Sequence, residues 1–523
     1  MIRFDTVKLS MKKPFFLTEA ASKIGVAPIT LKRWFLEGKI SDVKRDRKGW
    51  RVFTQEDIIR IKKYTDKISD PSPIQLSFKA EGFPDLINKS SCFRDSAFNG
   101  NKSLPFHRWV PWIAGFSASF VEDCFIKYLK KPSINKKLIL DPFAGVGTTL
   151  IEGILHGHNV AGFEINPYAY LACKVKLNAH KYDLKKIKSE LNKFIEYYKK
   201  RSNNEEYKPR ATAPEGFRTK APFFSPKVQR KVLIFFDFLN NINDRDIRDL
   251  FKLAFGSVMV SFSNYSYEPS LGRRSSAGRP DVIDADVEII ISEKIKSMIN
   301  DIEEFEELHA DSTKKLKISI YNESFFEAQK FLKNGSIDLL VTSPPYLNNY
   351  HYVRNTRPQL SWLELDKDRG RNRDLSEMSF GKFWQTVRDR ERIGLNFHLN
   401  SLEENITQLQ NINIEKGPYG GPGWANYVAT YFNDSKKFCK IIKKTLKSGC
   451  VAVIVIGNSI IQGIEIKTDR IFADIAELVG LKTKDIVLLR TKRTGSSIIN
   501  STVRAEFIQE KTELYETAVI LEA

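Results

Sequence analysis

Short apolar runs that end abruptly in polar residues or glycine recur along most of this 523-residue chain. Such runs are typical of strands that lie inside a sheet. Between them lie longer segments whose apolar positions recur at helical spacing, such as Leu150, Ile151, Ile154 and Leu155. Strand and helix signals therefore alternate along this part of the chain. The predicted strands are residues 138–140, 159–163, 316–324, 338–342, 451–459 and 516–521, and a further helix is predicted over residues 427–446.

The N-terminal residues follow a different, purely helical pattern. Apolar positions recur at helical spacing over residues 17–24, and Gly25 is typical of a helix end. Pro28 opens a second amphipathic segment, which Gly38 ends. A basic stretch with a glycine turn follows over residues 44–51, suited to a small wing. Thr54 and Asp57 then form a variant capping box that opens a third helix.

This order of helix, turn, helix, wing and helix resembles the winged helix-turn-helix of the MerR type. The resemblance implies that the second helix lies in the major groove of DNA while the wing holds phosphates. A small helical domain for protein contact or dimerisation is the alternative. The implied DNA-binding residues are Thr30, Lys32 and Arg33 in the second helix, and Arg45, Arg47 and Arg51 in the wing.

Composition narrows the class of partner. The chain has 83 Lys plus Arg against 63 Asp plus Glu, a formal net charge of +20. Such an excess favours a polyanion, because neutralising phosphates releases condensed counterions. A Lys-rich composition of the source genome would give the same number, so charge alone does not decide.

Other features exclude several settings. No stretch approaches the ~20 apolar residues of a membrane span, and the first 25 residues lack the apolar core of a secretory signal. The five cysteines are scattered, without a metal-ligand spacing. We therefore expect reduced thiols, no structural metal, no membrane contact and a cytoplasmic location.

Two strand-to-loop junctions carry the candidate chemistry. Residues 138–149 read Leu-Ile-Leu-Asp-Pro-Phe-Ala-Gly-Val-Gly-Thr-Thr, with glycines where a ligand must approach the backbone closely. Residues 338–346 read Asp-Leu-Leu-Val-Thr-Ser-Pro-Pro-Tyr. The phosphate-binding pattern GxxxxGK[ST] is absent from the sequence. Together these segments resemble the two motifs of the amino-group DNA methyltransferases, which transfer methyl from S-adenosylmethionine to an exocyclic base nitrogen.

The resemblance implies an α/β fold: a Rossmann-like methyltransferase with a mixed, mostly parallel sheet that ends in an antiparallel hairpin. It also implies a cofactor site across the first strands, with Glu164 accepting from the ribose hydroxyls. Asn322 stands where the family usually has Asp, which puts the detail of adenine binding in doubt. The expected cofactor-binding residues are Phe116, Ser117, Asp141, Phe143, Ala144, Gly145, Gly147, Thr148, Glu164 and Asn322.

The segment Ser343-Pro344-Pro345-Tyr346 suits transfer to an amine whose lone pair is delocalised. The Ser343 hydroxyl and the Pro344 carbonyl can accept both amino hydrogens, while the prolines fix the backbone. Tyr346 offers a face for an extruded base. Methylation of a ring carbon would need a Cys nucleophile, usually after Pro, and no Pro-Cys occurs.

Ser at the first motif position is more typical of cytosine-N4 enzymes, whereas adenine-N6 enzymes more often have Asp or Asn. We therefore expect an S-adenosylmethionine-dependent cytosine-N4 methyltransferase acting on double-stranded DNA. Its biological partner would be a cognate restriction endonuclease. Adenine-N6 methylation is the alternative, RNA methylation is a weaker one, and a DNA-binding regulator with an inactive methyltransferase body is the alternative from another class.

We expect a helix-turn-helix domain over residues 1–68, a linker over 69–103 and a methyltransferase domain over 104–523. Two insertions, residues 184–312 and 364–425, are the candidate target-recognition regions, and the sequence does not choose between them. Further DNA-binding residues are expected at Arg273, Arg274 and Arg354.

Overall fold

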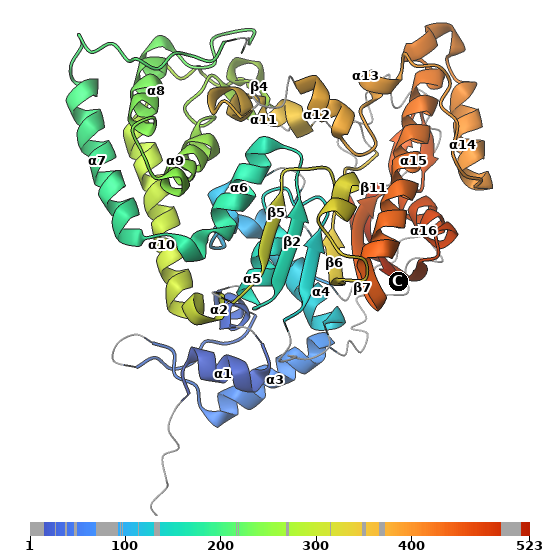
Figure 1. Ribbon diagram of the computed structural model, residues 1–523, viewed down its shortest axis with the longest axis horizontal. Helices are drawn as coiled ribbons and strands as arrows, with labels where there is room; N and C mark the ends of the chain where they lie inside the picture. Colours follow the sequence, from blue (N-terminus) through green and yellow to red (C-terminus); the bar gives the residue numbers. More distant parts are fainter. Residues whose placement is uncertain are drawn as a thin grey trace, which may run out of the picture.

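A seven-stranded sheet forms the centre of the computed structural model (Figure 1). The structure describes residues 15–26, 28–36, 39–46, 50–69, 93–94, 96, 98–112, 115–129, 136–215, 217, 219–267, 271–313, 315–347, 352–365, 372–492 and 514–523. The strand order is β10-β11-β7-β6-β1-β2-β5. The strands are β1 (Leu138–Asp141), β2 (Asn159–Phe163), β5 (Ile318–Tyr321), β6 (Ile337–Thr342), β7 (Leu446–Gly457), β10 (Lys482–Lys492) and β11 (Leu514–Glu522).

The sheet is mixed and mostly parallel, which confirms the predicted α/β methyltransferase fold. β1 pairs in parallel with β2 and β6, and β11 pairs antiparallel with both β7 and β10. The chain runs outward from β1 to β5 and then returns to β6 on the other side of β1. Such a reversal of strand order leaves a crevice at the carboxyl ends of the strands, where ligands bind in open α/β sheets.

Helices cover both faces of the sheet. Ile139 and Leu339 belong to one hydrophobic core, whereas their neighbours Leu140 and Leu340 belong to the core on the opposite face. This alternation follows from the period of two along a strand. The first core includes α4 (Ala118–Tyr128), α5 (Thr148–Leu155) and α6 (Pro167–Leu177), and the second includes α15 (Gly421–Thr445) and α16 (Thr468–Leu478).

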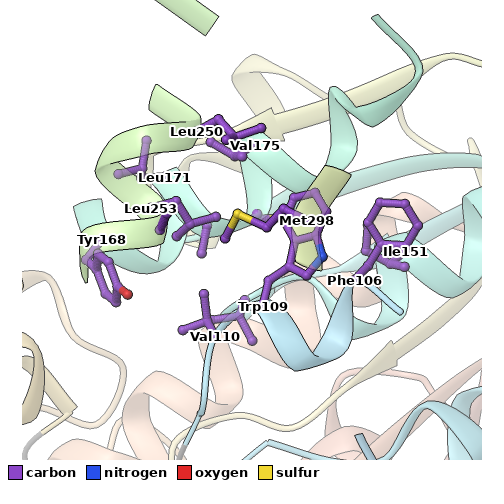
Figure 2. Packing of buried hydrophobic residues seen from close by; sticks show 14 of the residues in the cluster. Phe106, Trp109, Val110, Ile151, Tyr168, Leu171, Val175, Leu250, Leu253 and Met298 are labelled. Atoms are coloured by element: carbon purple, nitrogen blue, oxygen red, sulfur yellow. The ribbon is translucent and has the colours of Figure 1, made fainter. Parts of the chain in front are cut away.

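The segment between β2 and β5 is largely helical and adds to the first core. Ser225 caps α8, since its side chain accepts from Val228 N. Figure 2 shows Met298 of this segment beside Trp109, with Leu250 and Leu253 close by. The segment is therefore packed into the body of the protein. It contains α7 (Leu184–Ser202), α8 (Pro226–Leu239), α9 (Arg245–Val258), β3 (Tyr265–Tyr267), β4 (Leu271–Arg273) and α10 (Val287–Thr313).

A second helical segment separates β6 from β7. The helix predicted over residues 427–446 begins earlier, at Gly421. The following strand also begins earlier than predicted, at Leu446, and it ends at Gly457. The segment contains α11 (Tyr352–Trp362), α12 (Asn372–Met378), α13 (Trp384–Val387), α14 (Asn400–Gln410) and the 3-10 helix η7 (Ile414–Tyr419); after β7 come β8 (Ser459–Ile461) and β9 (Ile464–Ile466).

The N-terminal helices are α1 (Leu17–Ile24), α2 (Pro28–Leu36) and α3 (Gln55–Ser69). Gly25 ends α1 with φ 87°, and Thr54 and Asp57 cap α3 reciprocally, as predicted. Arg45 and Arg51 pair across the wing, while residues 38 and 47–49 lie outside the described residues. In Figure 1 these helices lie below the sheet, and α11 to α13 lie above it.

Parts of the predicted linker are described. The 3-10 helices η1 (Phe98–Ser103) and η2 (His107–Trp109) precede α4, and Arg94 donates to Asp123 on α4. Residues 70–92 lie outside the described residues. Within the part of the chain that the structure describes, no helix is long and apolar enough to cross a membrane.

Candidate active site

A cleft of about 830 Å³, its open mouth included, lies at the carboxyl ends of β1, β2 and β6. Both sequence motifs reach it, so the fold brings the two junctions together. The lining residues are Trp112, Phe143, Gly145, Glu164, Ile165, Asn166, Ser343, Pro345, Tyr346, Val353, Ser379, Phe380, Lys382, Phe383, Tyr427 and Tyr431.

The loop after β1 is tightly fixed. Asp141 is buried and accepts from Thr342 Oγ1 at 2.6 Å and from Phe143 N at 3.1 Å, which ties β1 to the end of β6. Burial raises the pKa of Asp141 to about 6. Gly145 has φ 51°, and a β-carbon there would lie 3.4 Å from Trp112 Nε1 across the cleft. Gly147 has φ 87° and caps α5.

Glu164 follows β2 and is anchored by backbone amides. Gly145 N donates to its Oε2 at 2.8 Å, and Asn166 N donates to its Oε1 at 2.7 Å. Each carboxylate oxygen can accept a second hydrogen bond. Burial raises the pKa of Glu164 to about 7, against the lowering effect of these amide donors.

Several expected cofactor residues support the cleft without lining it. Ala144 and Thr148 are buried, and Ala144 N donates to Phe163 O. The side-chain amide of Asn322 donates to the carbonyls of Glu164 and Ile165, at 2.7 and 3.3 Å. Asn322 thus holds the turn after β2. The sequence, in which Asn stands where the family usually has Asp, did not reveal this role.

Phe116 and Ser117 are not placed as predicted. The Ser117 hydroxyl accepts from Phe120 N at 3.1 Å and so caps α4, while Phe116 packs against Phe120. Both are buried, and neither is among the lining residues. Trp112, a few residues earlier, lines the cleft. The N-cap preference of Ser made the buried role at Ser117 foreseeable.

The loop after β6 presents Ser343, Pro345 and Tyr346 to the cleft, while Pro344 is buried. The Tyr431 hydroxyl donates to the Pro345 carbonyl at 3.0 Å. The Tyr346 hydroxyl donates to Glu516 Oε1 at 3.2 Å, and Arg490 pairs with the same carboxylate. The backbone and the aromatic ring of this loop are thereby held from α15 and from the final hairpin.

Sequence reasoning missed the side of the cleft that α15 and the residues after α12 build. Ser379, Phe380, Lys382 and Phe383 line it, and Gly381 packs so closely that a β-carbon would lie 2.4 Å from Tyr431 Cδ2. The spacing of four between the aromatic residues at 427 and 431 was an available signal, since it puts both on one helix face.

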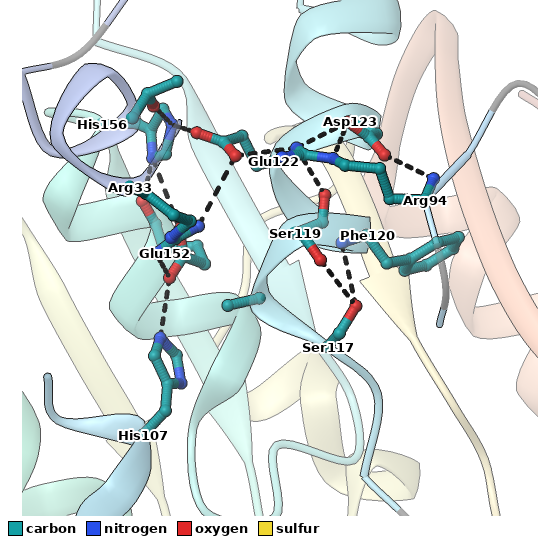
Figure 3. A network of polar contacts seen from close by, with 12 residues as sticks. Arg33, Arg94, His107, Ser117, Ser119, Phe120, Glu122, Asp123, Glu152 and His156 are labelled. Atoms are coloured by element: carbon teal, nitrogen blue, oxygen red, sulfur yellow. Dashed lines mark hydrogen bonds and ion pairs between the residues drawn. The ribbon is translucent and has the colours of Figure 1, made fainter. Parts of the chain in front are cut away.

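The second helix of the N-terminal unit, α2, is not oriented as predicted. Thr30 and Arg33 are buried, because α2 packs against α4 and α5. Figure 3 shows Arg33 among carboxylates of these helices. Lys32 pairs with Glu304 of α10. Thr30 and Arg33 therefore do not face solvent, and Lys32 is half-buried in its ion pair, so this face of α2 is not placed to read DNA in this structure.

The remaining predicted DNA-binding residues are distributed over several elements. In the wing, Arg45 and Arg51 both pair with Asp42, and Arg47 lies outside the described residues. Arg273 is exposed and pairs with Asp281, and Arg274 donates to the Pro280 carbonyl. Arg354 is exposed on α11, next to Val353 of the cleft.

Comparison with known proteins finds similarity to two kinds of protein. The family model described as MerR HTH family regulatory protein matches residues 16–65. Type II methyltransferase M.AvaI of a Nostoc species is 25% identical over 429 residues, covering 77% of this chain and 84% of that protein. Type II methyltransferase M.BsoBI of Geobacillus stearothermophilus is 23% identical over 437 residues, covering 77% and 83%.

A third relative, type II methyltransferase M.MvaI of Kocuria varians, is 25% identical over 243 residues, 46% of this chain and 53% of that protein. The fold, the cleft that contains both motifs and these relatives all point to the same class of protein. The chain is a homologue of type II methyltransferases over most of its length, with a MerR-type helix-turn-helix domain at its N-terminal end.

Proposed function

We propose that this protein is an S-adenosylmethionine-dependent DNA methyltransferase that modifies the exocyclic N4 of cytosine in duplex DNA. It would act as the modification part of a restriction-modification or phage-defence system, with a cognate endonuclease as its biological partner. The observation that carries the proposal is the single cleft lined by Gly145 and Glu164 on one side and by Ser343 to Tyr346 on the other.

The residues present suit S-adenosylmethionine. Gly145 leaves a space that a β-carbon would narrow against Trp112, and the adjacent Phe143 and Phe380 offer apolar faces. Glu164 would accept from the ribose hydroxyls through the oxygens that Gly145 and Asn166 already orient. The bound cofactor would supply an electrophilic methyl group on its sulfonium.

The catalytic loop would hold the target amine. Ser343 Oγ and the Pro344 carbonyl would accept the two amino hydrogens, which favours a nitrogen lone pair directed at the methyl group. The Pro345 carbonyl already accepts from Tyr431, so it fixes the loop and leaves the preceding carbonyl for the amine. Transfer would then be direct and in line, without a covalent enzyme intermediate.

Tyr346 would stack on the extruded base. Its hydroxyl bond to Glu516 fixes the ring in the cleft wall, so little rotamer entropy is lost when the base enters. Tyr427 and Phe383 lie in the same cleft and add aromatic surface. The site can therefore enclose a planar base between aromatic side chains.

Of the two insertions, residues 364–425 would supply target recognition. Four residues of this insertion line the cleft: Ser379, Phe380, Lys382 and Phe383. Beyond them Trp384 stacks on Trp424 at 4.9 Å, and Arg388 lies over Tyr419, which is 60% exposed. An exposed aromatic residue with an arginine beside it suits contact with nucleobases and phosphates.

The decisive assay incubates the protein with labelled S-adenosylmethionine and mixed-sequence duplex DNA, followed by digestion to nucleosides and mass spectrometry. Label in N4-methylcytosine is the expected outcome. Label in N6-methyladenine would overturn the base assignment alone. A folded protein that binds no cofactor and transfers no label would overturn the enzyme proposal in favour of a regulator.

A further inference from the structure

The second helix of the helix-turn-helix domain is buried inside the protein. Thr30 is 1% exposed and Arg33 is 3% exposed, both covered by α4 and α5. In a helix-turn-helix this helix normally enters the major groove. Here the same face makes intramolecular contacts with the methyltransferase body.

Arg33 makes the central contact. Its two terminal nitrogens bond both oxygens of Glu152 on α5, at 2.8 and 3.0 Å, and one of them lies 3.6 Å from Glu122 on α4. Figure 3 shows the guanidinium lying between these two carboxylates. A bidentate pair of this kind fixes both partners in position and orientation.

The charge of Arg33 completes a buried ionic cluster. Glu122, Asp123 and Glu152 are buried, and Arg94 bonds the first two from the segment before α4. Burial alone would raise the pKa of Glu152, but Arg33 and His107 lower it to about 2. Burial lowers the pKa of His107, so its imidazole is neutral near pH 7 and does not replace the arginine.

Glu152 links the cluster to the cleft. It lies in the middle of α5, which begins directly after Gly147 of the loop that lines the cleft. One turn before Glu152, the Thr149 hydroxyl donates to the Val341 carbonyl of β6 at 3.2 Å. A shift of α5 would therefore move the glycine loop and the strand that leads to Ser343.

Two further contacts widen the docking surface. Lys32 Nζ lies 2.6 Å from Glu304 Oε1 on α10, and Thr30 Oγ1 lies 2.8 Å from His156 Nε2 at the end of α5. Ile126 of α4 packs against the hydrophobic core of the helix-turn-helix domain. The domain is thus docked by apolar and ionic contacts to three helices of the body.

We infer that α2 is an intramolecular clamp in which Arg33 positions α5 and, through α5, the cofactor loop. While the clamp holds, the face of α2 that would read DNA stays covered by the methyltransferase body. The part about the cofactor loop rests on the proposed function. The part about the closed face does not. Arg33 is on this view a positioning residue, since it acts on the cleft through Glu152.

The first experiment compares Arg33→Gln, Glu152→Gln and their double variant, with Arg60→Gln as control. Arg60 lies on α3 of the same domain, is 45% exposed and pairs with Asp57, so its loss removes the same charge without touching the cluster. Arg33→Gln leaves the three buried carboxylates with Arg94, beside the imidazoles of His107 and His156, whereas the double variant restores the original charge balance.

Three readouts are taken at a temperature well below unfolding: S-adenosylmethionine affinity by calorimetry, amide hydrogen exchange across residues 148–155, and KM and kcat. We expect Arg33→Gln to weaken cofactor affinity about tenfold or more, with faster exchange in α5 and a raised KM at little-changed kcat. The double variant has the original charge balance but lacks the Arg33–Glu152 contact, so it should keep the weakened affinity and the faster exchange in α5, whereas Arg60→Gln should stay within about threefold of wild type. Wild-type affinity and wild-type exchange in Arg33→Gln would overturn the clamp.

A second experiment needs no substitution and remains decisive if Arg33→Gln fails to fold. A carbodiimide joins the Lys32 amine to the Glu304 carboxylate as an amide, since the two groups are in contact. We expect equal cross-linking with and without duplex DNA, and cross-linked protein that still binds DNA. Loss of the cross-link when DNA is added would overturn the closed face. If wild-type protein binds no cofactor, the proposed function fails while hydrogen exchange and cross-linking still test the clamp.

Discussion

The hydroxyl of Tyr346 donates to Glu516 Oε1 at 3.2 Å, which joins the loop after β6 to the last strand of the sheet. Glu516 is 4% exposed and also pairs with Arg490 of β10. The aromatic wall of the cleft is therefore set by the antiparallel hairpin at the end of the chain. This hairpin has a direct part in the geometry of the site.

Replacing Tyr346 separates stacking from anchoring. Tyr346→Ala should lower kcat/KM by roughly 5–150-fold, since stacking on a base is worth ~1–3 kcal/mol. Tyr346→Phe keeps the ring and should lose much less. Steady-state kinetics with a cognate duplex measures both. Equal losses in the two variants would show that the hydroxyl bond to Glu516, not the ring, carries the effect.

Ser343→Ala removes a proposed acceptor for the target amine. We expect kcat to fall by roughly 10²-fold, as when one preorganised polar contact to a reacting group is lost. Cofactor affinity should stay within about threefold of wild type, because Glu164 and the glycine loop are unchanged. Single-turnover kinetics and calorimetry measure the two quantities. Unchanged kcat would exclude Ser343 from the reaction.

The pKa of Glu164 predicts how cofactor binding depends on pH. An ionised carboxylate accepts from both ribose hydroxyls, whereas the protonated form offers one acceptor less. With a pKa of about 7 in the folded protein, affinity should rise as the pH increases towards 7 and level off above it. Calorimetry from pH 5.5 to 8.5 tests this, and Glu164→Gln should bind weakly with no such dependence.

The same group affects stability with a defined sign. Its pKa rises from an ordinary 4.5 to about 7 on folding, so between these values the folded protein retains a proton that the unfolded chain has lost. The free energy of unfolding therefore falls as the pH rises through this window. In denaturant titrations, Glu164→Gln should show a smaller fall in the free energy of unfolding across this pH window. An identical dependence on pH in both proteins would contradict the raised pKa of Glu164.

Gly147→Ala tests the packing of the glycine loop against a matched control. Gly147 and Gly157 have φ of 87° and 77°, but a β-carbon at Gly147 would lie 2.8 Å from Cys173 Sγ, whereas one at Gly157 meets nothing within 4 Å. Both substitutions bear the backbone strain of ~1–3 kcal/mol. Gly147→Ala should lose more stability in thermal unfolding, and it alone should weaken cofactor binding.

Local pattern made much of the fold predictable, because strands buried on both faces and capped helices leave strong signals. The α2 helix and the capping pair Thr54 and Asp57 are examples. The docking of α2 was not predicted, since helix-turn-helix periodicity does not show which face meets another domain. One signal was present: Glu122 and Asp123 stand between apolar residues of a mostly apolar helix, and buried carboxylates require cationic partners.

The candidate site divides in a similar way. The loops after β1 and β6 were predictable because each contains its own chemistry next to its strand. The positions of Lys382 and Phe383 were not predictable. These residues belong to a segment without clear periodicity, and they reach the cleft because Gly381 packs closely on Tyr431. Contacts set by the packing of distant segments leave little trace in local sequence.

The exposed aromatic residue at the rim tests the recognition role of residues 364–425. Tyr419 is 60% exposed beside Arg388, and Ile414, at the other end of η7, is 59% exposed. If Tyr419 stacks on a base, Tyr419→Ala should weaken duplex affinity by roughly 5–150-fold. Ile414→Ala removes a similarly exposed apolar side chain that lacks a π-face, so it should have little effect. Fluorescence anisotropy with a cognate duplex measures both, with cofactor affinity unchanged in each. Equal small losses would move recognition to the segment between β2 and β5.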